Sequence, residues 1–356
     1  MNPAWTWLVP AAALGLLAAA FALGTGPAIA ALAGVALVGA VIAAVHHAEV
    51  VAHRVGEPYG TLVLALAVTV IEASLILSMM LGGGPGTETL ARDTLYAAIM
   101  IICNGVVGLC ILVGGLKHRE QVFRVEGAHA GYAALVAMAG LTLVLPVFTV
   151  TTPSGTYSAS QLAFAAVASL ALWAVYVFVQ TVRHRDYFLP AEAAHDESAH
   201  AEPPSNATAW ASFGLLFASL VGVVGLAKVL SPSIERAVAA AGAPRAVIGI
   251  VIALIVLLPE TWAAVRAARA NRLQTSMNLA IGSALASIGL TVPVVALAAI
   301  ALGKPLVLGL DPKDLAMLAL TFLVGTISLG TGRTHLMQGA VLLVIFAAYL
   351  FLALVP

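Results

Sequence analysis

Charged side chains are scarce in this chain. Only 9% of its 356 residues are Asp, Glu, Lys or Arg, whereas 62% are hydrophobic and the mean hydropathy is +1.05. Soluble domains carry about 25% charged residues, so the composition excludes one. The net charge is zero, which leaves no basic excess to bind nucleic acid. We therefore expect an integral membrane protein with many spans.

Cysteine and N-terminal basic residues are also nearly absent. The two cysteines, Cys103 and Cys110, lie seven residues apart in one apolar segment, and we interpret them as small apolar helix residues rather than a disulfide. No Lys or Arg precedes the first apolar stretch, and no cleavage site follows it. That stretch is therefore expected to be a retained span and not a signal peptide.

Apolar runs long enough to cross a bilayer, about 20 residues, recur along the chain. Backbone polar groups must be satisfied within the membrane, so these runs predict helices and an all-α fold. We expect about eleven transmembrane helices, at residues 5–23, 28–52, 60–83, 94–116, 128–150, 159–182, 210–230, 244–268, 275–302, 313–332 and 336–355.

The basic residues between these spans predict the orientation. Ten lie in loops on the N-terminal side, against six on the other side. Because Lys and Arg are retained in the cytoplasm, we expect a cytoplasmic N-terminus in the inner (plasma) membrane.

A polar segment at residues 183–209, with five Asp or Glu, divides the spans into six and five. If the helix at 5–23 lies outside the repeats, each half of the chain holds five spans. Because five is an odd number, the second half then has the opposite orientation in the membrane to the first. We predict one inverted repeat within 1–182 and another at 210–356, separated by a cytoplasmic acidic loop. Substrate sites form where such repeats meet, near the bilayer midplane. No residue pattern sets the oligomeric state.

Two lone carboxylates, Glu72 and Glu260, lie within apolar runs of matching spans in the two halves. Burying a charge in hydrocarbon costs several kcal/mol, so such acids are functional-site hypotheses. No Lys or Arg lies in the core of any span, which argues against ion pairing. Glu260 lies only six residues before Arg266, which would place it near the cytoplasmic face unless the helix unwinds at Pro259 or Arg266 reaches back toward water.

Neutral oxygens lie in the same spans. A divalent cation such as Ca²⁺ takes six to eight oxygen ligands. Pro259 has no N–H, so the carbonyl of Ile255 is expected to be free. Other candidate ligands, of which Ser283 and Ser287 share a helix face, are Thr69, Asn104, Asn278, Ser283 and Ser287.

The same two acids predict proton coupling. Burial and mutual repulsion disfavour their charged forms when no cation is present, so Glu72 and Glu260 are expected to bind protons instead. A site that holds either protons or a cation, and reorients only when occupied, is an antiporter. No cofactor is expected, since the cation is the transported substrate.

A second polar group lies at residues 46–53. Its histidines and acid, with His46, Glu49 and His53 on roughly one helix face, are interpreted as a polar cap at the membrane edge, as a relay for proton or cation access, or as a metal site. The spacing is not the His-Glu-x-x-His of a zinc protease. The acidic loop is interpreted as a solvated linker or a low-affinity cation collector.

Two stretches carry a family resemblance. HHAEVVAHRVGEPYGT (residues 46–61), continuing to Glu72, resembles the first α-repeat of bacterial calcium/proton antiporters of the ChaA type, in the cation/calcium exchanger superfamily. LPETWAAVRAARANRLQTSMNLAIGSALASIGL (residues 258–290) is similar to the second. The resemblance implies eleven helices, alternating access, and Glu72 and Glu260 as calcium- and proton-binding acids with Asn104 and Ser283 beside them. The chain departs from sodium-driven members, which carry further polar or acidic residues in the second helix of each repeat.

The sequence thus favours a transporter that exchanges Ca²⁺ for H⁺ and exports calcium. One alternative keeps the mechanism and changes the cation to K⁺ or Na⁺. Another is a passive cation channel, which the paired acids disfavour. A membrane-embedded hydrolase built on the residue 46–53 cluster is a third, but no nucleophile or metal triad accompanies it.

Overall fold

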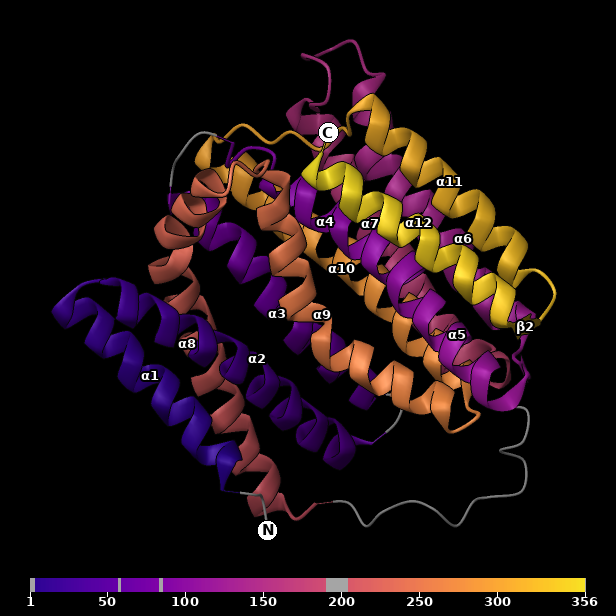
Figure 1. Ribbon diagram of the computed structural model, residues 1–356, viewed down its shortest axis with the longest axis horizontal. Coiled ribbons are helices and arrows are strands. Elements are labelled where there is room, and N and C mark those ends of the chain that lie inside the picture. Colours follow the sequence, from indigo (N-terminus) through magenta and orange to yellow (C-terminus); the bar gives the residue numbers. More distant parts are fainter. Residues whose placement is uncertain (1–3, 57–58, 83–85, 190–203, 356) are drawn as a thin grey trace. The chain divides into compact units, whose positions relative to one another are not determined.

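The computed structural model describes residues 4–56, 59–82, 86–189 and 204–355. The chain is almost entirely helical (Figure 1). Its elements are α1 (Trp5–Leu23), α2 (Pro27–Val55), α3 (Tyr59–Gly82), α4 (Leu90–Met100), η1 (Ile101–Val106), α5 (Val107–His118), β1 (Glu120–Val122), α6 (Val125–Ala139), η2 (Gly140–Val144), η3 (Leu145–Val147), α7 (Ala159–Phe178), η4 (Val179–Arg183), η5 (Arg185–Phe188), α8 (Asn206–Ala240), α9 (Ala246–Arg269), α10 (Leu273–Leu302), α11 (Pro312–Leu329), β2 (Arg333–His335) and α12 (Leu336–Leu354).

The predicted spans are confirmed as helical segments. Ten described helices are long and apolar enough to cross a membrane, and α3 adds a shorter apolar stretch, Leu66–Leu81. The segments α4, η1 and α5 form one span, Leu90–His118. The largest difference from the prediction is α8, which continues to Ala240 instead of ending at residue 230. Charged residues end a hydrophobic run but remain good helix formers, so the helix continues where the run stops.

A two-stranded antiparallel ribbon was not predicted. β1 follows α5 and pairs with β2, which precedes α12, with Glu120 opposite His335 and Gln121 opposite Thr334. Each strand has three residues, too short for an alternating pattern to stand out between two helices. The all-α fold class is confirmed, and this short ribbon and an isolated bridge between Thr156 and Val307 are additions to it.

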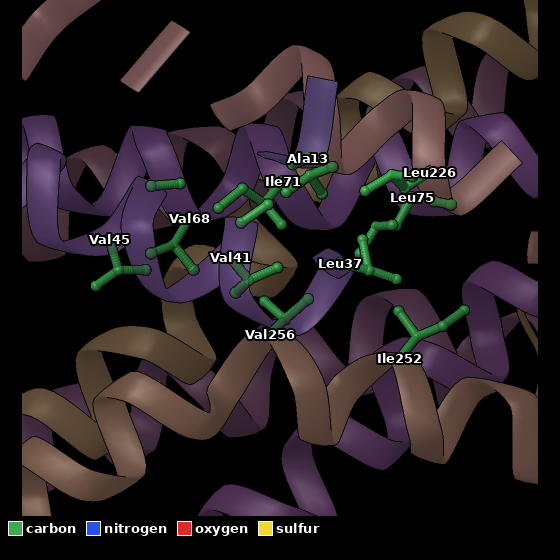
Figure 2. Packing of buried hydrophobic residues seen from close by; sticks show 14 of the residues in the cluster. Ala13, Leu37, Val41, Val45, Val68, Ile71, Leu75, Leu226, Ile252 and Val256 are labelled. Atoms are coloured by element: carbon green, nitrogen blue, oxygen red, sulfur yellow. The ribbon is translucent and has the colours of Figure 1, made fainter. Parts of the chain in front are cut away.

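The chain forms two compact units, and each takes segments from both halves of the sequence. Unit 1 comprises Met1–Leu90 and Ala201–Val256, and its core lies between α1, α2, α3, α8 and the first part of α9 (Figure 2). Buried residues recur every three or four positions, as at Leu37, Val41 and Ala44 of α2. That spacing places them on one helix face.

Unit 2 comprises Ala91–His200 and Leu257–Pro356. In it α7 packs on α10, and α5 packs on α12 (Figure 1). Likewise α6 packs on α7, and α11 on α12. Suppose that α5, α6 and α7 of the first half correspond to α10, α11 and α12 of the second. The pair α7–α10 then corresponds to the pair α12–α5, and the pair α6–α7 corresponds to α11–α12. Such reciprocal packing is what two repeats related by a twofold axis produce, and it agrees with the predicted inverted repeats.

Glycine permits the close approach in both of these pairs. A Cβ added at Gly289 of α10 would lie 2.5 Å from the Trp173 side chain of α7, and one added at Gly339 of α12 would lie 2.5 Å from the backbone of Leu112. Small residues bring helices together in membranes in this way.

Candidate functional site

Glu72 is the buried acid of unit 1. Only 2% of it is exposed, and it lies on α3 between the buried residues Ile71 and Ala73. Thr69, three residues earlier and therefore on the same face, is 5% exposed, and its hydroxyl has no hydrogen-bond partner within the described residues. The predicted pair of an acid and a neutral oxygen is thus present on one face of this helix.

Glu260 of unit 2 is half-buried on α9. That helix does not unwind at Pro259; it runs without a break to Arg269. The expected unwinding at Pro259 is therefore absent, and the other expectation, that Arg266 reaches back toward water, stays a prediction. Glu72 lies 13 residues after the start of α3 and 10 before its end, and Glu260 lies 14 after the start of α9 and 9 before its end.

This match places both acids near the middle of their helices. At 1.5 Å per residue, nine or ten residues correspond to about 14 to 15 Å, half of the ~30 Å hydrocarbon thickness. A central depth for Glu260 requires the side chain of Arg266, six residues later, to reach toward the interface. Arg266 is exposed, but the helix continues for three more residues.

Asn104 is fully buried within the π-helical segment η1. Its Nδ2 donates a hydrogen bond to Thr321 Oγ1 at 2.9 Å, and that hydroxyl donates to the carbonyl of Met317 at 2.8 Å. Its Oδ1 has no hydrogen-bond partner in the described part of the chain. π-Helical turns inside α-helices often mark functional sites, and the amide oxygen here can bind a ligand or water.

Sequence reasoning missed Thr321, although it is a fully buried hydroxyl of α11. Its backbone carbonyl accepts a hydrogen bond from the Tyr132 hydroxyl at 3.0 Å. A single threonine in an apolar span is common because its hydroxyl can bond within its own helix. The only available signal was a lone hydroxyl within the apolar run at residues 313–332.

The serines of α10 lie as predicted, one turn apart, with Ser287 3% exposed and Ser283 half-buried. Asn278 has a different surrounding. Its Nδ2 donates to the carbonyl of Phe188 at 2.6 Å, and its Oδ1 accepts from Gln274 at 2.9 Å. Both ends of its amide are therefore engaged within the protein, and it holds η5 against α10.

The histidine cluster of α2 is divided. His47 is fully buried, and its Nε2 lies 2.9 Å from the carbonyl of Thr6. The His46 ring packs on Trp5 with the ring centroids 5.2 Å apart, whereas Glu49 and His53 are exposed. Two of these side chains thus join α1 to α2.

No three described His, Cys, Asp or Glu residues could hold a metal ion, so the geometry gives no support to a metal triad at residues 46–53. The relay role stays a prediction. Most of the acidic segment, 190–203, lies outside the described residues, and within its described part His184 stacks on Tyr187 with centroids 4.9 Å apart.

Comparison with known proteins identifies the fold and the family. The sodium/calcium exchanger protein family matches residues 25–182 and 211–355. The chain is 48% identical to the protein y4hA of Sinorhizobium fredii over 99% of this chain and 97% of that one. It is 36% identical to the sodium-potassium/proton antiporter ChaA of Escherichia coli, over 90% and 87%.

A crystal structure of the selenium-substituted Ca²⁺/H⁺ antiporter protein YfkE has the same fold, with a TM-score of 0.74, 16% identity and 99% coverage of both chains. The resemblance to ChaA-type antiporters, drawn above from two stretches of sequence, is therefore confirmed over nearly the whole length. The chain belongs to the sodium/calcium exchanger protein family.

Proposed function

We propose that the protein exchanges Ca²⁺ for H⁺ by alternating access and exports calcium at the expense of the proton gradient. The observation that carries this proposal is the match between Glu72 and Glu260. One acid stands in each repeat, within one residue of the same position along its helix. Transporters built from inverted repeats bind their substrates near the bilayer midplane, and an acid at the matching position of each repeat supplies negative charge for a cation.

The chemistry follows from these groups. Two carboxylates balance the charge of one Ca²⁺, and Thr69, Asn104, Ser283 and Ser287 offer neutral oxygens of the kind that calcium binds. When the cation leaves, the carboxylates remain in an apolar surrounding that disfavours their charge, so protons replace it. The loaded states are then close to neutral and can reorient, whereas the empty site carries two charges that oppose reorientation.

A second candidate cargo is K⁺ or Na⁺. The Escherichia coli relative is named a sodium-potassium/proton antiporter, and its likeness to this chain extends over nine-tenths of the sequence. A monovalent cation needs only one of the two carboxylates for charge balance, so the second acid would keep its proton. Cation selectivity and the number of protons exchanged are therefore linked in this site.

We further propose that the protein lies in the inner membrane with its N-terminus in the cytoplasm. The excess of Lys and Arg on that side supports this orientation. Membrane spans are supported by the ten long apolar helices.

Transport in proteoliposomes tests the proposal. Vesicles with an acidic lumen contain a pH dye, and Ca²⁺, K⁺ and Na⁺ are added outside in turn. The variants are Glu72→Gln and Glu260→Gln, and Glu126→Gln at an exposed position of α6 serves as the matched control.

Alkalinisation of the lumen by Ca²⁺ alone, lost in both site variants and kept in the control, is the expected result. If K⁺ or Na⁺ alkalinises the lumen to the same extent, we would conclude that the protein also transports monovalent cations. If folded protein moves cations without moving protons, the result would support a passive cation channel, and the antiport proposal would then be wrong.

A further inference from the structure

The C-terminal end of α9, the helix of Glu260, is held by hydrogen bonds from its own backbone and from side chains of other elements. Asn271 adopts a left-handed conformation with φ of 59°. The N–H of Arg272 bonds to the carbonyl of Ala267 at 3.0 Å, and the N–H of Asn271 bonds to that of Ala268 at 3.1 Å. This is a Schellman motif with asparagine in the place usually taken by glycine.

Side chains from the end of α5 and from β1, in the first half of the chain, complete the cap. Nε2 of Gln121 in β1 donates to the carbonyl of Ala268 at 2.9 Å and to Oδ1 of Asn271 at 3.0 Å. The carbonyl of Arg269 lies 3.0 Å from Lys117 Nζ and 3.0 Å from His118 Nε2 at the end of α5. The last carbonyls of a helix have no partner within it, so these side chains satisfy groups that water or a loop would otherwise have to satisfy.

The side chain of Gln121 is buried and tightly packed at this helix end. It is 2% exposed, and its side chain occupies the space where a Cβ at Gly114 would otherwise lie. Pairing with Thr334 in the β1–β2 ribbon fixes its backbone. The buried glutamine thus joins the end of α9 to the ribbon and to the end of α5.

α10 is attached to the same end. The hydroxyl of Ser276 near the start of α10 donates to the carbonyl of Ala264 in α9 at 2.9 Å. The ends of three segments therefore meet at this cap: α9, which carries Glu260; the α4–η1–α5 span, which carries Asn104; and α10, which carries Ser283 and Ser287. Figure 1 shows the ends of α5 and α9 beside the ribbon.

We propose that Gln121 is a positioning residue for cation exchange, which sets the register of the Glu260 helix relative to the helices that carry Asn104 and the two serines. The inference rests on the proposed function. Gln121 itself touches no ion. A cation site tolerates displacements of its ligands of only about 0.5 Å, and a helix freed at its capped end can slide or rotate by more than that.

The primary variant is Gln121→Met, which keeps the length of the side chain and removes its hydrogen bonds to the Ala268 carbonyl of α9 and to the capping residue Asn271. Its matched control is Gln338→Met. Gln338 also satisfies a helix end in unit 2, because its Oε1 accepts from the N–H of His335 at 2.7 Å, but it caps α12, which carries none of the predicted site residues.

A second variant protects the test against misfolding. Lys117→Met combined with His118→Phe removes both donors to the Arg269 carbonyl and leaves the buried Gln121 in place. Because Lys117 is exposed and His118 is half-buried, this double variant disturbs the packing less.

Initial rates of Ca²⁺-driven proton exchange are measured against Ca²⁺ concentration, together with the melting temperature of each purified protein. The loss of one hydrogen bond of ordinary strength corresponds to about a fivefold change in an equilibrium. We expect the half-saturating Ca²⁺ concentration to rise about fivefold or more in Gln121→Met and in the double variant, with a smaller change in the maximal rate. Gln338→Met should lower the melting temperature without changing that concentration.

A half-saturating concentration within twofold of wild type in both variants would overturn the positioning role while leaving the antiport proposal intact. The same rise in Gln338→Met would also overturn it, because the effect would then be general loosening. If the wild-type protein exchanges no protons for Ca²⁺, K⁺ or Na⁺, the proposed function fails first and this inference falls with it.

Discussion

Replacing Thr321 by valine tests the contact that holds Asn104. Valine has nearly the same shape as threonine and lacks the hydroxyl, so the 2.9 Å hydrogen bond from Asn104 Nδ2 is lost without a change of volume. Both residues are 0% exposed, so water cannot take over the bond. The matched control is Thr326→Val on the same helix, where the exposed hydroxyl bonds only to its own helix, at the carbonyl of Phe322.

The expected cost can be bounded from both sides. Hydrogen bonds between membrane helices are worth about 0.6 kcal/mol on average and up to about 1.7 kcal/mol, and a buried donor left without a partner costs about 1 to 3 kcal/mol. We expect Thr321→Val to destabilise the protein by about 1 to 2 kcal/mol. For 356 residues, an unfolding entropy of about 2.1 cal/mol/K per residue converts this into a melting shift of about 1 to 3 °C. The control should shift by less than about 0.5 kcal/mol.

The two cysteines provide the assay. Cys103 and Cys110 are both buried, at 4% and 0% exposure, and both lie in the span that carries Asn104. A thiol-reactive fluorogenic dye therefore reports the opening of this span during a temperature ramp in detergent. Equal melting temperatures for Thr321→Val and Thr326→Val would show that the contact between α11 and η1 contributes nothing, and the account of Asn104 given above would be wrong.

Further predictions concern packing. Gly339→Ala should destabilise the protein by several kcal/mol or prevent its folding, because the new Cβ would meet the backbone of Leu112, which cannot move aside; measured yield and melting temperature check this. Gly214→Ala, in α8 with open space around it, should stabilise by up to about 1 kcal/mol, and a fall in melting temperature would contradict the stated geometry. His47→Phe should remove the bond to the Thr6 carbonyl and cost about 1 kcal/mol, seen as faster proteolysis at the link between α1 and α2; unchanged proteolysis would count against a joining role.

Much of this molecule could be read from the order of its residues. A bilayer requires about 20 apolar residues for each span, so the number and approximate place of the helices follow from local composition. The same reasoning singled out Glu72 and Glu260, since a carboxylate in a hydrophobic run is conspicuous without any knowledge of its neighbours. The expected unwinding at Pro259 did not occur, because α9 continues through it to Arg269; a charged residue marks the end of a hydrophobic run and not the end of a helix.

Tertiary structure decided the rest. Asn104 and Thr321 are 217 positions apart, and Gln121 and Ala268 are 147 apart, so no local pattern indicates either contact. The same holds for the β1–β2 ribbon, which forms only because the chain brings two three-residue segments together. Sequence sets which residues enter the membrane, because burial in lipid is a property of each segment by itself. Which side chains then satisfy one another's polar groups is fixed only when the helices pack.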